Sequence, residues 1–265
     1  ARKVGRARAA FPGWAATPVA DRAACLERAA GGFEAHRGRL LHLLQAEAGK
    51  TLDDALSEWR EAIDFLRYDA AQGRSLFRRP AALPGPAGES NALWLRGRGV
   101  IAAISPWNFP LAIFIGQVAA ALMAGNTVVA KPSEVTPATA TMLAELCAQI
   151  GFPRGVLNIV HGLGPEVGAP LVAHPAIRAV SFTGSTAVGR TIAATCAPLL
   201  RKVSLELGGK NPTLVFADSD WRANLDTLVR SAFQNSGQIC LCGSRILIER
   251  SVYEPVREAL VERAR

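Results

Sequence analysis

Residues 100–131 read VIAAISPWNFPLAIFIGQVAAALMAGNTVVAK, and this stretch indicates how the chain folds. The apolar runs at 100–104 and 127–130 have the length of strands, whereas the apolar pattern over 110–123 has the length of a helix. A strand, a helix and a second strand in this order are typical of a βαβ unit. The stretch therefore predicts parallel strands covered by helices.

The same alternation continues along the chain. Apolar runs at 156–160, 179–182 and 203–207 alternate with helical patterns at 138–150, 166–174 and 185–196. This predicts an α/β fold with a doubly wound, Rossmann-like parallel sheet. Amphipathic patterns before residue 75 predict an N-terminal helical region, and the Pro/Gly-rich segment 79–86 predicts a connector followed by a strand at 91–98.

The composition limits the classes of function. The chain has 265 residues, of which 49% are hydrophobic, so it can bury a sizeable core. The longest apolar run, 111–123, is interrupted by Gln117 and is shorter than the ~20 residues of a membrane span, which predicts a buried helix and no membrane partner. The net charge is +8, but the basic residues are mostly spread among acidic ones. Even the densest group, which begins with Arg74, Arg78 and Arg79, favours a solvated or interface face over a nucleic-acid site.

The five cysteines are scattered and odd in number, which does not predict a disulfide framework. Such usage suits a reducing compartment, the cytosol or the mitochondrial matrix, and we expect a cytoplasmic protein. Cys240 and Cys242 form a Cys-x-Cys pair without a second cluster or a nearby His, so we expect no metal site.

Two motifs point to covalent thiol chemistry. Residues 233–240 read FQNSGQIC, which places Cys240 just after a Gly-Gln turn, and residues 205–210 read LELGGK, which places Glu206 on a short apolar run. A cysteine nucleophile needs a base that activates it or the water that later attacks it. The pair is therefore a candidate nucleophile and general base.

These motifs, together with PWNFP at 106–110, AKPSE at 130–134 and FTGS at 182–185, resemble those of the NAD(P)-dependent aldehyde dehydrogenase superfamily in order and approximate spacing. The resemblance covers roughly residues 10–260. It implies oxidation of an aldehyde, with a semialdehyde favoured, to the acid with NAD as the hydride acceptor. It also implies that residues 1–98 form helices and an oligomerisation segment, 99–230 an NAD-binding domain and 231–265 the start of a catalytic domain.

The resemblance assigns catalytic roles to Cys240, Asn108, Glu206 and Lys131. Cys240 would attack the aldehyde, and the amide of Asn108, preset in a rigid turn, would donate to the oxyanion. Glu206 would activate water, and partial burial should raise its pKa towards working pH. The structural alternatives are an Asn that satisfies its turn and a Glu paired with Lys210. Cys25, Cys147 and Cys196 are expected to be buried structural residues.

The resemblance also assigns the cofactor contacts. Lys131 and Glu134 would contact the adenosine ribose, and the carboxylate of Glu134 would repel a 2′-phosphate, which favours NAD over NADP. Gly184 and Ser185 open a helix whose free N–H groups suit a pyrophosphate, although Ser185 is equally explained as an N-cap. GLGPEVG at 162–168 is one residue longer than the dinucleotide fingerprint, and an ordinary turn is the alternative. The remaining expected contacts are Ile104, Trp107, Gly164, Gly168, Phe182 and Leu207.

Two subfamilies are represented. Residues 1–132 look like the glutamate-semialdehyde dehydrogenase half of the proline-catabolic bifunctional enzyme, and residues from 133 onward look more like muconic-semialdehyde dehydrogenases. Family members are roughly twice as long and carry a Glu-x-Phe-Gly-Pro segment without a match here, so we expect a truncated chain that forms homo-oligomers when complete. The alternative is a non-catalytic nucleotide-binding or oligomerisation fragment.

Overall fold

The computed structural model describes residues 1–77 and 80–265, and the chain forms two compact units. The first unit is Ala1–Glu206 and the second is Leu207–Arg265. The predicted domain boundaries at residues 98 and 230 fall inside these units and stay predictions.

A five-stranded sheet forms the centre of the first unit. Its strands lie in the order β5-β4-β3-β6-β7, and β3, β4, β5 and β6 pair in parallel. Every residue of β3 and β4 is buried, which explains why these strands read as continuous apolar runs. The predicted doubly wound α/β fold is confirmed. The strands are β3 (Val100–Ile104), β4 (Thr127–Lys131), β5 (Leu157–Ile159), β6 (Ile177–Gly184) and β7 (Lys202–Leu207).

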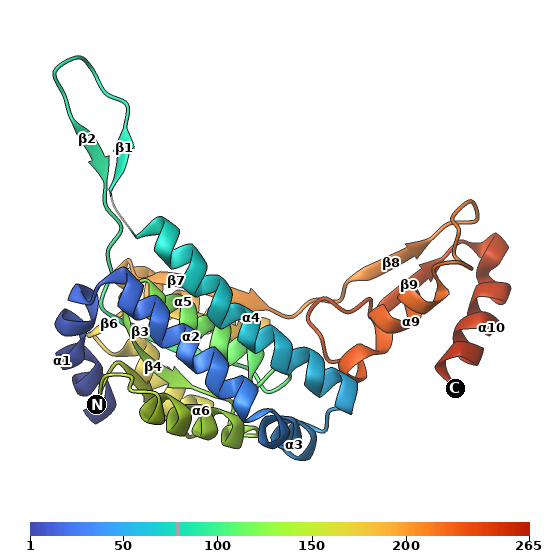
Figure 1. The fold of residues 1–265 in the computed structure, drawn as a ribbon. Helices are drawn as coiled ribbons and strands as arrows, with labels where there is room; N and C mark the ends of the chain where they lie inside the picture. The colour runs from blue at the N-terminus through green and yellow to red at the C-terminus, as the bar shows by residue number, and fades with distance from the viewer. Residues whose placement is uncertain (78–79) are drawn as a thin grey trace. The chain divides into compact units, whose positions relative to one another are not determined.

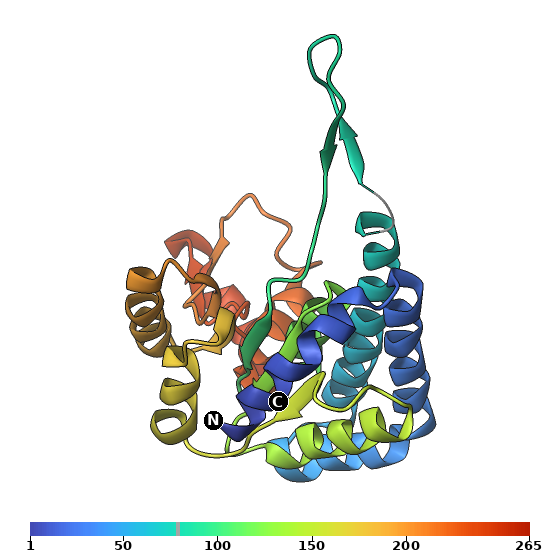
Figure 2. The same ribbon diagram turned by 90° about the vertical axis from the view of Figure 1, so that its left-hand side faces the viewer.

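Helices cover both faces of this sheet. Helix α5 (Ala112–Met123) connects β3 to β4 and is largely buried, as the apolar run predicted. Helix α6 (Pro137–Gln149) packs against β5, and helices α7 (Ala169–Ala173) and α8 (Thr186–Cys196) pack against β6. Figure 2 shows α7 and α8 on one side of the sheet and the helices α2 (Val19–Ala35) and α4 (Leu52–Leu76) on the other.

The chain begins with four helices, of which the second, third and fourth extend the core on the α5 side (Figure 1). They are α1 (Arg2–Ala16), α2 (Val19–Ala35), α3 (Arg37–Ala48) and α4 (Leu52–Leu76). Gly49 ends α3 with a φ of 65°, and Thr51 caps α4 by accepting a hydrogen bond from the Asp54 N–H at 3.1 Å. Apolar side chains such as Phe33 and Phe114 are fully buried between these helices and α5.

A β-hairpin projects from the first unit (Figure 1). Its strands are β1 (Ala81–Leu83) and β2 (Asn91–Leu93), and all their residues are exposed. The expected connector therefore contains a strand, and the strand expected over 91–98 ends at Leu93. In the basic group, Arg74 pairs with Glu27, whereas Arg78 and Arg79 lie outside the described residues.

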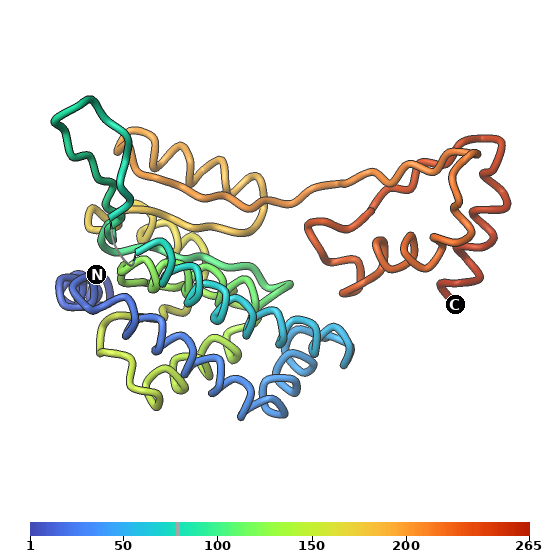
Figure 3. Tube along the Cα trace, turned by 45° about the horizontal axis from the view of Figure 1, so that its top comes forward, coloured from blue at the N-terminus to red at the C-terminus, as the bar shows by residue number. Residues whose placement is uncertain are grey.

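The second unit has a parallel strand pair with two helices. Strands β8 (Pro212–Val215) and β9 (Arg245–Ile248) pair in register, and the chain between them passes through α9 (Leu225–Phe233) before α10 (Tyr253–Ala264) follows β9 (Figure 3). Its small core contains Val215, Trp221 and Val256. This unit has a βαβ pattern of its own, and the expected start of a catalytic domain at residue 231 stays a prediction.

Candidate active site

The carboxyl ends of β3, β4 and β6 border a cavity of about 550 Å³ within the first unit. The strand order reverses between β3 and β6, and doubly wound sheets bind ligands outside the carboxyl ends of their strands at such a point. Leu207, one of the ten predicted cofactor contacts, belongs to the second unit. The other nine line this cavity: Ile104, Trp107, Lys131, Glu134, Gly164, Gly168, Phe182, Gly184 and Ser185.

Lys131 and Glu134 form an ion pair at the end of β4. The Lys131 Nζ lies 2.9 Å from Glu134 Oε2, and the lysine side chain is 4% exposed whereas that of the glutamate is 42% exposed. The hydrogen bond from Lys131 holds the pKa of Glu134 below its usual value, so the carboxylate stays ionised at neutral pH. A buried cation and an accessible anion are thus presented side by side to the cavity.

The end of β6 and the start of α8 form a second wall. A Cβ atom added to Gly184 would lie 2.6 Å from Cζ of Phe182, so only glycine fits against this ring. Ser185 caps α8, because its Oγ accepts a hydrogen bond from the Val188 N–H at 3.3 Å. The Ser185 hydroxyl therefore acts as an N-cap. The other N–H groups in the first turn of α8 still give the start of this helix its affinity for anions.

The glycine segment 162–168 forms the third wall. Residues Gly164–Gly168 make a single π-helical turn that continues into α7, which is a geometry often found at functional sites. The helix predicted from residue 166 therefore begins two residues earlier as a π turn. A Cβ added to Gly168 would lie 3.6 Å from Cδ of Lys131, so this turn packs beside the buried lysine.

The hydroxyl group of Ser105 is an unsatisfied polar group in the cavity wall. Its Oγ is buried and has no hydrogen-bond partner within residues 1–77 and 80–265. An unpaired buried hydroxyl costs free energy, which a bound polar ligand would recover. Sequence reasoning missed Ser105, although its place directly after the apolar run 100–104 puts it at the carboxyl end of a strand.

The cavity fits a dinucleotide in size and chemistry. Its volume lies within the ~300–1,000 Å³ typical of small-molecule sites. Apolar side chains such as Val172 and Ile192 suit a flat ring, whereas Lys131, Ser105 and the start of α8 suit ribose hydroxyls and phosphates. The lining residues therefore fit a nicotinamide dinucleotide.

Asn108 lies on the loop between β3 and α5, next to Trp107, which lines the cavity. The main-chain carbonyl of Asn108 accepts a hydrogen bond from Lys50 Nζ at 2.9 Å. The loop is thus fixed from outside the sheet by a side chain that the sequence analysis did not single out.

Glu206 occupies the end of β7, and its side chain is exposed. The partial burial expected for Glu206 was therefore wrong for this structure, because β7 is an edge strand whose residues are mostly exposed. The apolar neighbours in the sequence suggested burial but do not cover the carboxylate.

Cys240 lies in the second unit, on the segment between α9 and β9, and is exposed. Cys25, Cys147 and Cys196 are buried, as expected for structural cysteines, and burial raises the pKa of the Cys147 thiol to about 12. Cys240 is therefore much more accessible to reagents than these three thiols.

The backbone before Cys240 is unusual. The φ values of Asn235, Ser236 and Gly237 are 53°, 57° and 70°, so three consecutive residues are in the left-handed region. Residues other than glycine rarely adopt this conformation. The Asn211 amide donates a hydrogen bond to the carbonyl of Cys240 at 2.7 Å and holds the end of this run. Costly backbone conformations concentrate at functional sites, and this one presents an exposed thiol.

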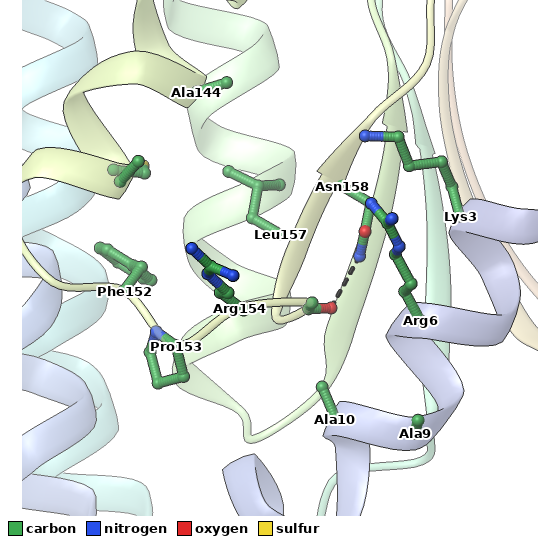
Figure 4. Close-up of a pocket in the computed structure, with 13 residues that line it drawn as sticks. Lys3, Arg6, Ala9, Ala10, Ala144, Phe152, Pro153, Arg154, Leu157 and Asn158 are labelled. Carbon is green, nitrogen blue, oxygen red and sulfur yellow. Dashed lines mark hydrogen bonds between the residues drawn. The ribbon is translucent and has the colours of Figure 1, made fainter.

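Figure 4 shows a larger cavity, of about 750 Å³, between α1 and the start of β5. Lys3, Arg6 and Arg154 contribute cations to it, and Asn158 Nδ2 donates to the Gly155 carbonyl at 2.7 Å. This cavity lies at the amino end of its strand, and no residue predicted for catalysis or cofactor binding lines it. The candidate site is therefore the cavity at the carboxyl ends.

The described ranges 1–77 and 80–265 contain neither a membrane span nor a metal cluster. No helix there is long and apolar enough to cross a membrane. No group of three or more His, Cys, Asp or Glu side chains there is arranged to hold a metal ion.

The chain is similar to several known proteins. The model of the aldehyde dehydrogenase family matches residues 1–265. The 2-aminomuconic semialdehyde dehydrogenase of Danio rerio is 44% identical over 99% of this chain and 54% of its own length. The NADP(+) succinate-semialdehyde dehydrogenase GabD of Escherichia coli is 37% identical over 97% of this chain and 53% of its own length.

A solved structure resembles the chain closely. Proline utilization A from Bradyrhizobium japonicum, in a mutant form, is 50% identical with a TM-score of 0.94, over 98% of this chain and 27% of that protein. The chain spans about half the length of the curated relatives that it matches.

Proposed function

The chain belongs to the aldehyde dehydrogenase family, and we propose that it carries the cofactor site and the catalytic thiol of an NAD-dependent enzyme that oxidises an aldehyde to its carboxylic acid. The observation that supports this most strongly is the convergence of nine predicted contacts, from four separate stretches of sequence, on one cavity at the carboxyl ends of β3, β4 and β6. Sequence proximity alone does not bring these stretches together.

The cavity would hold NAD with its adenosine ribose against Lys131 and Glu134 and its pyrophosphate at the start of α8. The ionised carboxylate of Glu134 accepts hydrogen bonds from ribose hydroxyls and repels a 2′-phosphate, which favours NAD over NADP. GabD shows that related enzymes use NADP, so this preference depends on Glu134 rather than on the fold.

The chemistry would proceed through the thiol of Cys240. Its thiolate adds to the aldehyde carbon, and the carbonyl oxygen becomes an oxyanion that the side-chain amide of Asn108 stabilises by donating a hydrogen bond. NAD, when bound, supplies the acceptor for the hydride that leaves this carbon. Water then attacks the resulting thioester, Glu206 removes a proton from the water, and the acid and the thiolate are released.

A semialdehyde is the proposed class of substrate. The similar proteins from Danio rerio and Escherichia coli are both named for semialdehyde oxidation. The length of the chain relative to these proteins also supports the second candidate, a nucleotide-binding fragment without turnover. Direct comparison of NAD binding with NADH formation distinguishes the two.

We further propose that the protein forms homo-oligomers through the β1–β2 hairpin and works in the cytoplasm. The hairpin presents exposed strand edges, and Leu83, Leu93 and Trp94 on or next to its strands are about half exposed or more. Unpaired edges and exposed apolar side chains are typical of strand-mediated association. All five cysteines are free thiols, as a reducing compartment requires. Sedimentation of the protein with and without residues 81–93 tests the association.

The test of catalysis compares two neighbouring cysteines in the whole protein in which these residues occur. Cys240→Ala should abolish NADH formation from a semialdehyde and leave NAD binding intact. Cys242→Ala is the matched control and should retain turnover. The Cys242 thiol donates a hydrogen bond to the carbonyl of Gly237, and the proposed chemistry does not use it. Equal activity of the two variants would exclude Cys240 as the nucleophile, and alkylation near neutral pH should label Cys240 well before the buried Cys147.

A further inference from the structure

A buried ion pair lies behind the Asn108 loop. Lys50, between α3 and α4, places its Nζ 3.0 Å from Oε2 of Glu58 on α4, and the two side chains are 2% and 0% exposed. Burial raises the pKa of Glu58, while the charge of Lys50 opposes this rise. The mechanism above uses neither residue.

Four contacts of this pair reach one short segment. Glu58 Oε1 accepts hydrogen bonds from the N–H groups of Leu111 at 2.8 Å and Ala112 at 3.1 Å, which lie at the start of α5. Lys50 Nζ donates to the Asn108 carbonyl at 2.9 Å and lies 4.4 Å from the centroid of the Phe109 ring. The pair thus holds both ends of residues 108–112.

Such a pair is a poor way to gain stability. Removing two charges from water costs about as much free energy as their attraction returns, so apolar replacements of similar volume are often neutral or stabilising. A pair buried in this way is better explained by the geometry that it imposes. Here it fixes the main chain from Asn108 to Ala112, and neither Lys50 nor Glu58 lines the cofactor cavity.

We infer that Lys50 and Glu58 are positioning residues that set the main chain of the Asn108 loop, so that the Asn108 amide meets the oxyanion at hydrogen-bond distance. This inference rests on the proposed function. Because the Asn108 hydrogen bond strengthens as the oxyanion forms, misplacement of the loop should lower kcat far more than it raises the KM for NAD. A displacement of about 1 Å can cost up to ~100-fold in rate, so we expect a decrease of about 10- to 100-fold.

The decisive variant replaces both charges, Lys50→Met with Glu58→Leu, in the whole protein. The double variant leaves no buried charge without its counter-charge, whereas each single substitution does. It still frees the N–H groups of Leu111 and Ala112, so we expect it to melt below the wild type and above either single variant. At a temperature where it is folded, it should bind NAD as the wild type does and have kcat reduced by about 10- to 100-fold. Wild-type kcat in this folded variant would overturn the positioning role.

Arg22→Met is the matched control for general destabilisation of α5. Arg22 is buried, and its Nε donates to the Met123 carbonyl at 3.1 Å, at the opposite end of the same helix. This variant should lower the melting temperature and leave kcat unchanged at a temperature where it is folded. An equal loss of kcat in this control would show that any weakening of α5 suffices and would overturn the inference.

A mutant cycle with Asn108 tests whether the pair acts through this residue. In an Asn108→Ala background, the double replacement of Lys50 and Glu58 should cause no further loss of kcat, because the donor that it positions is gone. Fully multiplicative losses would overturn the inference and leave the proposed function intact. A wild-type protein without turnover, or an Asn108→Ala variant with full turnover, would instead contradict the proposed function itself and the inference with it.

Discussion

Replacement of Gly184 by alanine should weaken NAD binding without unfolding the protein. The added Cβ would lie 2.6 Å from Cζ of Phe182 and 3.2 Å and 3.4 Å from its two Cε atoms, so the ring must move by roughly 1 Å to reach ordinary contact distances. Phe182 is almost fully buried and lines the cavity, which is the open space that its ring can enter. The displaced ring then occupies volume that the cofactor needs.

The size of the effect follows from the cost of overpacking. Extra atoms in a packed site cost about 1–3 kcal/mol. If the ring relieves this strain by entering the cavity, the same free energy is lost again when NAD pushes it back, which corresponds to about 5- to 150-fold weaker binding. Calorimetric titration with NAD measures the change.

A second glycine provides the control for this experiment. Gly31 lies on α2, and a Cβ added there would meet nothing within 4 Å, so Gly31→Ala should leave the dissociation constant unchanged. If Gly184→Ala bound NAD as tightly as the wild type, the cavity at the carboxyl ends would not be the cofactor site.

Three further substitutions test the electrostatics and the helix ends. Glu134→Gln should lower the preference for NAD over NADP by roughly 5- to 30-fold, measured as the ratio of the two kcat/KM values. The substitution removes about 1–2 kcal/mol of repulsion between a half-exposed carboxylate and the 2′-phosphate of NADP. Burial raises the pKa of Asp69 from 3.8 to about 6, so the folded state binds this proton more tightly and stability should decrease as pH rises from 4 to 6. Asp69→Asn should remove this decrease and stabilise the protein at pH 7 by about 1–2 kcal/mol, a value discounted for partial exposure. Urea titrations at pH 4 and pH 7 measure both effects. Glu47→Ala should cost about 1–2 kcal/mol of stability, because the Glu47 carboxylate accepts hydrogen bonds from the Ala138 and Thr139 N–H groups at the start of α6; an unchanged unfolding midpoint would contradict this.

The buried strands and their helices could be predicted from the sequence. The run 100–104 coincides with β3, because a parallel strand covered on both faces reads as continuous apolar residues. Residues at the carboxyl ends, such as Lys131 and Gly184, could be placed by the same argument once the strands were known. The resemblance added their expected roles.

Features without a local apolar signal could not be predicted. The strand at 81–83 is exposed and lies in a Pro/Gly-rich segment, so it shows neither alternation nor burial. The burial of Glu206 was predicted from its apolar neighbours, but an edge strand leaves the side chain exposed. The contact of Lys50 with the Asn108 carbonyl joins residues 58 positions apart, which only the tertiary structure brings together.

Titration of NAD into the 265-residue chain is the measurement that tests the central claim most directly, because the whole cavity lies within Ala1–Glu206. We predict saturable binding with a stoichiometry of one per chain, weakened by Gly184→Ala and unaffected by Cys240→Ala. Failure of the folded chain to bind NAD or NADP, with circular dichroism showing intact secondary structure, would contradict the assignment of this cavity as the cofactor site.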